Sequence, residues 1–187
     1  MPFDHFDLIA GIYNRTAPFS APAGLIDLLA LPLKGMLLDV GGGTGRVTEA
    51  FRQTVQEGIV ADPSRGMLRQ ARNKGLVAVC SPAEKLPFRT NTFYGIIMVD
   101  ALHHVNNQRE TVHELWRVLA PGGRVVIIEP DISKFVVKLV SVGEKLLLMR
   151  SHFLSAEKIA ALFFDLGTEV GIIHDESNVW VYAEKVR

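Results

Sequence analysis

Four glycines within five consecutive positions are the feature that most restricts the fold. They occur in the segment DVGGGTG (residues 39–45), which follows an apolar run and precedes a helix-like stretch that begins near Arg46. Glycine adopts positive φ angles and lets a ligand approach the backbone, but each glycine costs conformational entropy on folding. A turn that only joined a strand to a helix would not need four. We therefore predict a strand–loop–helix unit whose loop holds a ligand.

Short apolar segments alternate with helix-like segments through the first two thirds of the chain. Alternation of this kind is typical of parallel strands connected by helices. The runs IIMV (96–99) and VVII (125–128) are apolar throughout, as a sheet covered on both faces requires. The expected strands span residues 36–40, 58–61, 76–80, 95–99 and 124–129, and the expected helices between them 46–55, 64–73 and 110–119.

The last third of the chain has a different pattern. Two helix-like segments are followed by two β-rich segments, separated only by the polar stretch HDESN, which fits a hairpin and is too short for a crossover helix. We therefore expect one α/β domain over residues 1–187, with a doubly wound, seven-stranded sheet that is mostly parallel and has an antiparallel C-terminal hairpin strand. The expected helices are 135–149 and 155–166, the latter from Ser155 to a stop at Gly167, and the expected strands 169–173 and 179–184.

Charge and composition exclude several classes of function. The chain has 20 Lys and Arg residues and 20 Asp and Glu residues, so we expect no basic surface that would bind nucleic acid. The single cysteine, Cys80, excludes an intramolecular disulfide and a cysteine-rich zinc site. Charged residues interrupt the apolar stretch from Ile132 to Met149 too often for a membrane span. The acidic start MPFDHFDLIAG is unlike a signal peptide, and we expect a cytoplasmic protein.

The residues around the glycines narrow the class of ligand. A dinucleotide fingerprint needs G-x-G-x-x-G, and Arg46 occupies the third glycine position when the pattern starts at Gly41. No G-K-[ST] follows, which excludes a phosphate P-loop. Asp39, at the end of the first expected strand, would repel a pyrophosphate and attract an ammonium or sulfonium group. The ligand is therefore expected to have a cationic end.

A second carboxylate, Asp62, ends the second expected strand in the segment IVADPS. Its offset from the glycine loop is close to that of a ribose-binding carboxylate, which can accept hydrogen bonds from both hydroxyls. The alternative role is an N-cap of the next helix, because Asp is a favoured capping residue. Both roles are compatible with one side chain.

Five motifs occur in a characteristic order and spacing: LLDVGGGTGR, VADPSRGMLRQAR, AEKLPF, FYGIIMVDALHHV and LWRVLAPGGRVVIIEPD. The chain resembles the class I S-adenosylmethionine-dependent methyltransferases, and most of all the group that contains the ubiquinone and menaquinone biosynthesis methyltransferases. The resemblance extends from about Phe6 to the C-terminus. It implies a Rossmann-like fold, S-adenosyl-L-methionine as the methyl donor and S-adenosyl-L-homocysteine as the product.

The resemblance also implies roles for individual residues. Asp39 and the backbone of Gly41 and Gly43 would hold the methionine end of the cofactor. Asp62 would bind the ribose hydroxyls, and Met67 would lie against the adenine ring, which suits its polarisable side chain.

Three further roles follow from the resemblance. Relatives usually carry an acid before AEKLPF that takes the adenine amino group, but Pro82 stands there, so either Ser81 or the backbone near Ala83 serves instead or the affinity is weaker. Asp100 is an expected cofactor neighbour. Tyr13 matches an aromatic residue that commonly touches the cofactor, with ordinary packing on the core as the alternative.

Two adjacent histidines, His103 and His104, follow the fourth expected strand. The near-neutral pKa of imidazole makes either one a candidate general base. Relatives with different acceptors share the pair, so a structural role for at least one is the alternative. Of the two, His103 is the predicted catalytic residue. Methyl transfer depends mainly on positioning, which agrees with the lack of a recognisable triad or metal-ligand cluster in the sequence.

The methyl acceptor depends on the segments that would cover the cofactor. These are the N-terminal residues 1–35 and the aliphatic insertion 131–154, for which a core helix or a dimer contact is the alternative. We expect a small, largely uncharged molecule as acceptor, and an aliphatic cover would also accept an apolar one. Both a monomer and a dimer are compatible with the sequence. Two rival functions are considered. One is a cofactor-binding protein without activity, for which the replacement of an acid by Pro82 is the only indication. The other is a nicotinamide-dependent oxidoreductase, which the presence of Asp39 and Arg46 beside the glycine loop makes a poorer fit.

Overall fold

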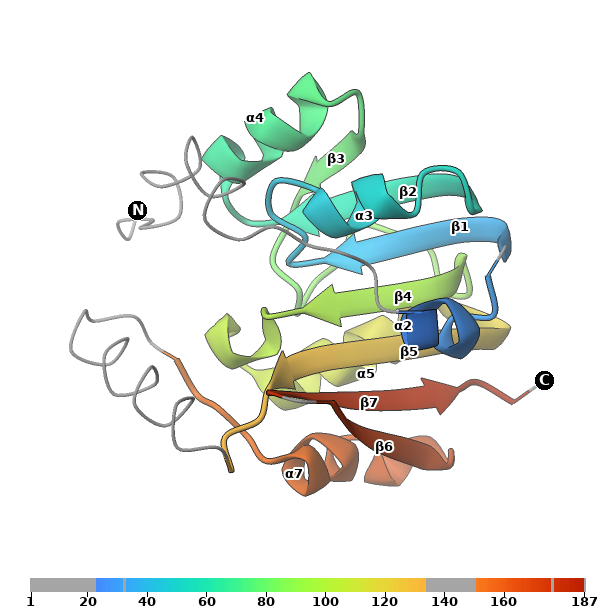
Figure 1. Cartoon of the computed structure of the whole chain (residues 1–187), viewed down its shortest axis with the longest axis vertical. Coiled ribbons are helices and arrows are strands. Elements are labelled where there is room, and N and C mark those ends of the chain that lie inside the picture. The colour runs from blue at the N-terminus through green and yellow to red at the C-terminus, as the bar shows by residue number, and fades with distance from the viewer. Residues whose placement is uncertain (1–22, 32, 134–150, 176, 187) are drawn as a thin grey trace.

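One seven-stranded sheet with helices on both faces forms the body of the protein (Figure 1). The computed structural model describes residues 23–31, 33–133, 151–175 and 177–186. The strands are β1 (Leu33–Val40), β2 (Val55–Asp62), β3 (Val77–Cys80), β4 (Phe93–Val99), β5 (Leu119–Pro130), β6 (Val170–Asp175) and β7 (Asn178–Glu184). The helices are α2 (Ala23–Leu28), α3 (Arg46–Ala50), α4 (Arg65–Asn73), α5 (Gln108–Val118) and α7 (Ala156–Ala161), with short 3₁₀ turns η1 (Leu102–His104) and η2 (Phe164–Leu166).

The strand order is β3-β2-β1-β4-β5-β7-β6. Strands β1 to β5 are parallel, whereas β7 runs antiparallel to both β5 and β6. The sequence-based prediction of a mostly parallel sheet with an antiparallel C-terminal hairpin strand is therefore confirmed. All seven expected strands are present. Strands β2 and β5, with 8 and 12 residues, are twice as long as expected, and β3 begins one residue later than expected.

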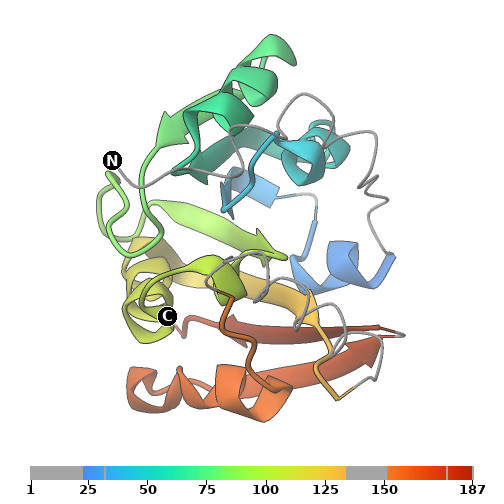
Figure 2. The ribbon, with the colours of Figure 1, turned by 90° about the vertical axis from the view of Figure 1, so that its left-hand side faces the viewer.

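Helices cover both faces of the sheet, as Figure 2 shows from the side. On one face α5 and α7 pack against the sheet, and on the other face α2, α3 and α4 do so. Neighbouring residues of one strand serve opposite layers: Ile96 belongs to the α5 and α7 layer and Ile97 to the α2 and α3 layer, and both are fully buried. This explains why the central strands are apolar throughout.

The helix expected over residues 46–55 is wrong at its C-terminal end. Helix α3 stops at Ala50, because the amide and the hydroxyl of Thr54 both donate to the Phe51 carbonyl, at 2.9 and 3.0 Å, and close a turn. Val55 then begins β2. A β-branched pair such as Thr54 and Val55 favours the strand over another helical turn.

The strand order reverses direction between β1 and β4. Strands β2 and β3 lie on one side of β1, whereas β4, β5 and the hairpin strands lie on its other side. At such a switch point the loops that follow the strands diverge and leave a crevice at the carboxyl edge of the sheet. The loops after β1, β2, β3 and β4, which begin at residues 41, 63, 81 and 100, all lie at this edge.

Some sequence-based predictions fall outside the described residues. They are the helix expected over residues 135–149 and the position of Tyr13. Within the part of the chain that the structure describes, none of the helices has the length and apolar character needed to cross a membrane.

Candidate functional site

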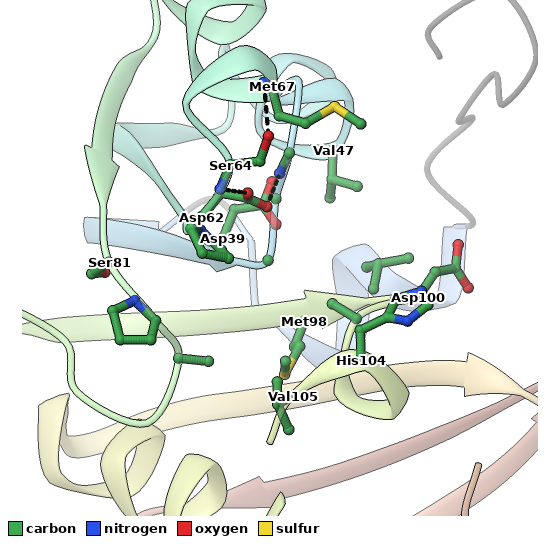
Figure 3. A pocket seen from close by; sticks show the side chains of 18 of the residues that line it. Asp39, Val47, Asp62, Ser64, Met67, Ser81, Met98, Asp100, His104 and Val105 are labelled. Atoms are coloured by element: carbon green, nitrogen blue, oxygen red, sulfur yellow. Dashed lines mark hydrogen bonds between the residues drawn. The ribbon is translucent and has the colours of Figure 1, made fainter. Parts of the chain in front are cut away.

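A cavity lies at the switch point, where the loops after β1, β2, β3 and β4 converge (Figure 3). Its wall combines carboxylates, open backbone and thioether side chains from segments far apart in the sequence. Figure 3 places Ser81 at one side of the site and Asp100 and His104 at the other, with Asp39 and Asp62 between them. Seven of the predicted site residues line the cavity: Asp39, Gly41, Gly43, Asp62, Met67, Ala83 and Asp100.

Three glycines of the loop have positive φ angles, but they serve different purposes. A Cβ on Gly41 (φ +68°) would lie 2.5 Å from the Ala101 Cβ, and one on Gly45 (φ +72°) would lie 2.3 Å from a Leu76 methyl. These two are required by packing as well as by conformation. A Cβ on Gly43 (φ +54°) would meet nothing closer than 3.9 Å, with Asp62 and Met67 as its neighbours. Gly43 therefore faces open space inside the cavity.

Asp62 ties the glycine loop to the start of α4. One carboxylate oxygen accepts a hydrogen bond from the Gly43 amide at 2.9 Å, and the other accepts from the Ser64 amide at 2.7 Å. The N-cap of α4 is Ser64, whose hydroxyl accepts from the Met67 amide at 3.3 Å. The capping role considered for Asp62 thus belongs to Ser64, a residue that the sequence analysis did not single out.

Asp39 lies beneath the loop and is almost completely buried. Its Oδ2 accepts hydrogen bonds from the hydroxyl and the amide of Thr48, at 2.7 and 3.2 Å. Its Oδ1 is buried without a hydrogen-bond partner among the described residues. Burial raises the pKa of Asp39 to about 6, although both Thr48 hydrogen bonds and the charge of Arg46 oppose the shift. A cation above the loop would stabilise the ionised form.

Arg46 and Asp100 form an ion pair across the mouth of the loop, with 2.9 Å between Nη2 and Oδ2. Both residues line the cavity. Asp100 has a φ of +52°, a conformation that Asp tolerates better than most residues, and its amide donates to the Ile128 carbonyl at 2.9 Å. Arg46 was not among the residues predicted to line the site, although it opposes a dinucleotide fingerprint. Its position directly after the glycine loop was the available signal that it lines the site.

The loop after β3 carries the residues discussed for adenine recognition. Ser81, Pro82 and Ala83 all line the cavity. Ser81 is buried, its amide donates to the Asp62 carbonyl at 3.2 Å, and its hydroxyl has no hydrogen-bond partner in the described part of the chain. Pro82 is exposed. The loop therefore offers a hydroxyl and backbone groups in place of a carboxylate.

The two histidines occupy different environments. His103, the predicted catalytic residue, does not line the cavity: its Nδ1 lies 2.5 Å from Oε2 of Glu129, and its ring stacks on Phe153 with 4.2 Å between the centroids. His104 does line the cavity, and its Nδ1 lies 3.4 Å from the Ser151 hydroxyl. Burial, together with the charge of His103, lowers the pKa of His104 to about 3. His104 is therefore a neutral imidazole at physiological pH.

A second cavity adjoins the first and shares Val105 and Asn106 with it. Its apolar wall includes Ile132, Phe153 and Leu154, which belong to the described ends of the insertion 131–154. The two cavities together form a site with one compartment at the glycine loop and another beside α5 and α7. Within the described ranges, no group of three or more His, Cys, Asp or Glu side chains is placed to hold a metal ion.

The first cavity suits a ligand with several distinct parts. The carboxylates of Asp39 and Asp62 favour a positive charge and hydroxyl donors, whereas Met67, Met98 and Val47 present apolar and polarisable surface. Open backbone at Gly43 allows close approach between them. This arrangement agrees with the ligand class expected from the sequence.

Comparison with known proteins gives a consistent result. Residues 38–127 match the methyltransferase domain family. Over 116 residues, the chain is 37% identical to the ubiquinone/menaquinone biosynthesis C-methyltransferase UbiE of Pectobacterium atrosepticum, a match that covers 56% of this chain and 45% of that enzyme. The matched part therefore spans less than half the length of that curated relative.

Solved structures share the fold over nearly the whole chain. The methyltransferase in a complex with the Haloferax volcanii Trm112 methyltransferase activator superposes with a TM-score of 0.80 at 17% identity, covering 100% of both chains. An S-adenosylmethionine-dependent methyltransferase from Aquifex aeolicus superposes with a TM-score of 0.74 at 22% identity, covering 97% of this chain and 98% of that one. At these identities the likeness establishes the fold.

Proposed function

We propose that the chain, whose residues 38–127 match the methyltransferase domain family, transfers a methyl group from S-adenosyl-L-methionine to a small-molecule acceptor. The donor, when bound, supplies an electrophilic methyl group together with its own leaving group. The protein's task is then to bind the donor, orient the acceptor and exclude water.

The residues of the first cavity fit this donor. Asp39, with an unpartnered buried oxygen beneath the loop, would stabilise the cationic methionine end, and the backbone at Gly41 and Gly43 would approach it closely. Arg46 is placed to pair with a carboxylate at the same end. Its bond to Asp100 would hold it in position there.

The nucleoside part would occupy the other side of the cavity. Asp62 would accept hydrogen bonds from the ribose hydroxyls, while Met67 would pack against the base. Ser81 and the backbone near Ala83 would take the place of the missing acid at Pro82. The observation that carries the proposal is Asp62, which bonds the Gly43 amide and the start of α4 at once and so fixes loop and helix around one binding site.

The acceptor would enter through the second cavity. Val105 and Asn106 line both cavities, so a molecule in the second one lies next to the first. Residues 151–154 line this second cavity, whereas residues 23–28 and 33–35, which were expected from the sequence to cover the site, form α2 on a face of the sheet and the start of β1. Holding donor and acceptor in adjoining compartments would lower the activation barrier by about 7–11 kcal/mol through proximity and orientation. For this, the nucleophile has to approach the methyl group in line with the bond that breaks.

A transfer assay tests this function. The protein would be incubated with S-adenosylmethionine labelled in its methyl group and with quinone precursors, phenols, amines and thiols in separate reactions. We expect label in the product of at least one class, and no label when Asp62 is replaced by Ala. Binding of the donor without transfer to any class would contradict the enzyme assignment and support the alternative of a cofactor-binding protein without activity.

A thermal-shift comparison separates the proposed cofactor from a nicotinamide. S-adenosylhomocysteine at 100 times its dissociation constant stabilises a folded protein by about 2.7 kcal/mol, which raises the melting temperature measurably. NADH should give no shift. The reverse pattern would favour the oxidoreductase alternative.

A further inference from the structure

One carboxylate joins the loop after β3 to the start of α5. Oε1 of Glu84 accepts hydrogen bonds from the amides of Asn106 and Asn107, at 2.8 and 3.1 Å. Glu84 lines the first cavity, Asn107 lines the second, and Asn106 lines both. A side chain in the wall of one cavity therefore holds the backbone from which the wall of the other begins.

Further contacts tie the same loop to α5 and to the first cavity. The Leu86 amide donates to Oε1 of Glu114 at 2.7 Å, and the Leu86 carbonyl accepts from Nη2 of Arg117 at 3.1 Å. Glu114 and Arg117 both belong to α5. At the other end of the loop, the Ser81 amide donates to the carbonyl of Asp62, at 3.2 Å. The loop therefore connects the residue expected to bind the ribose with α5.

The segment that Glu84 holds forms one side of the second cavity, since residues 105–109 all line it. Asn107 is the N-cap of α5, and its Oδ1 accepts a hydrogen bond from the Glu110 amide at 3.1 Å. The next residue, Gln108, donates from Nε2 to the His152 carbonyl at 2.6 Å, and His152 also lines the cavity. The position of Asn107 therefore determines where α5 begins and how this side of the second cavity is arranged.

We propose that Glu84 is a positioning residue that couples the two cavities, so that the methyl donor in the first cavity fixes the wall of the second for the acceptor. The inference rests on the proposed function, in which the nucleoside part of the donor lies against the loop after β3. Glu84 acts through the amides of Asn106 and Asn107 and takes no part in the transfer itself.

Solvent exposure supplies the two states that such coupling needs. Glu84 is half-buried and both asparagines are exposed, so water competes with the two amides for the carboxylate, and the bonds open and close in the free protein. A donor in the first cavity displaces water from beside Glu84, and a hydrogen bond strengthens where water is excluded. The donor thereby favours the closed state. By linkage, an acceptor that needs the closed wall strengthens donor binding by the same factor.

Hydrogen exchange of single amides measures this coupling with S-adenosylhomocysteine as the only ligand. The reporters are the amides of Asn107 and Glu110, because neither residue lines the first cavity and a bound donor would not touch them. In the parent protein, saturation with S-adenosylhomocysteine should increase the protection of both amides at least about fivefold, the lower end of the usual coupling between two sites. No increase at Asn107 would overturn the proposal.

Variants at residue 84 separate coupling from general stabilisation by the ligand. Glu84→Ala removes the acceptor, so S-adenosylhomocysteine should leave the protection of Asn107 unchanged. Glu84→Gln keeps an acceptor oxygen without its charge and should show a smaller increase than the parent. Glu57→Ala is the control, since Glu57 is exposed on β2 outside both cavities, and should show the full increase. The amide of Ile127, which is fully buried in β5, reports whether each variant is folded.

An increase at Asn107 that is undiminished in either Glu84 variant, or that is lost equally in Glu57→Ala, would overturn the proposal. Failure of S-adenosylhomocysteine to bind the parent protein would instead overturn the proposed function.

Discussion

Glu129 and His103 form a buried pair at the end of β5, with 2.5 Å between Oε2 and Nδ1 and only 4% of each side chain exposed. The second oxygen of Glu129 accepts hydrogen bonds from the amides of Ala101 and Leu102, at 2.9 and 2.8 Å. One carboxylate thus holds the turn after β4 at three consecutive residues. That turn carries His104 and contacts the glycine loop, since Ala101 packs on Gly41. Glu129 therefore positions the wall of the site without lining it.

Replacement of Glu129 by Ala should be strongly destabilising. It would leave His103 and two buried amides without their acceptor, and removal of one member of a buried pair typically costs about 3–5 kcal/mol. Urea unfolding of the parent and the variant measures the loss. Glu129→Gln, which keeps an acceptor oxygen, should lose less. A change below about 1 kcal/mol in Glu129→Ala would show that water or another group satisfies these donors.

Alanine at Gly41 and at Gly43 should have contrasting effects. Gly41→Ala combines a left-handed backbone with a Cβ 2.5 Å from Ala101, so we expect a loss of stability above about 2 kcal/mol. Gly43→Ala meets no close neighbour and should lose about 1 kcal/mol, but its methyl group would project between Asp62 and Met67. Affinity for S-adenosylhomocysteine should therefore fall at least about tenfold in Gly43→Ala, an effect of about 1.4 kcal/mol.

Urea unfolding and calorimetric titration of the two variants check this pair of expectations. Gly43→Ala binding S-adenosylhomocysteine as tightly as the parent would mean that the loop does not face the ligand at this residue.

The buried carboxyl of Asp39 predicts a pH dependence of stability. Its pKa is raised from 3.8 to about 6 in the folded protein, so between these values the folded state binds more protons than the unfolded state. The contribution of Asp39 to stability should therefore fall as the pH rises from about 4 to about 6, by roughly 3 kcal/mol, and stay low above pH 6.

The comparison of the parent with Asp39→Asn isolates this effect, because the other titrating groups are common to both proteins. The free energy of unfolding of the parent minus that of the variant should decrease between pH 4 and pH 7. A difference that is constant with pH, or one that increases with pH, would show that burial does not raise the pKa of Asp39.

The sequence was sufficient to predict the sheet and to name many of the residues that line the first cavity, because both depend on local signals. Strand position, the helix stop at Gly167 and the glycine loop are encoded by neighbouring residues. The boundary between α3 and β2 was missed, since it depends on a side-chain bond from Thr54 to Phe51 that periodicity does not reveal. Asp62 and Met67, both named from the sequence, line the cavity, Asp62 as the last residue of β2 and Met67 in the first turn of α4.

The roles of the two histidines could not be separated in the same way. Successive side chains of a 3₁₀ turn point about 120° apart, so one of two adjacent histidines faces the interior and the other the cavity. Which one does so is decided by Glu129, 26 residues away along the chain, and by Phe153, a residue of the later insertion. Long-range contacts of this kind leave no pattern in a single sequence.

Calorimetric titration with S-adenosylhomocysteine, for the parent and for Asp62→Asn, tests the central claim most directly. The exchange keeps the size of the side chain but replaces one carboxylate oxygen by an NH₂ group, which donates hydrogen bonds. The side chain then has only one oxygen left to accept from the Gly43 amide, the Ser64 amide and the ribose hydroxyls. We predict binding by the parent with one site per chain, and an affinity at least about tenfold lower in the variant, since hydrogen bonds to a charged group contribute about 1.5–3 kcal/mol. No binding by the parent, or equal affinity in both proteins, would contradict the assignment of this cavity as the methyl-donor site.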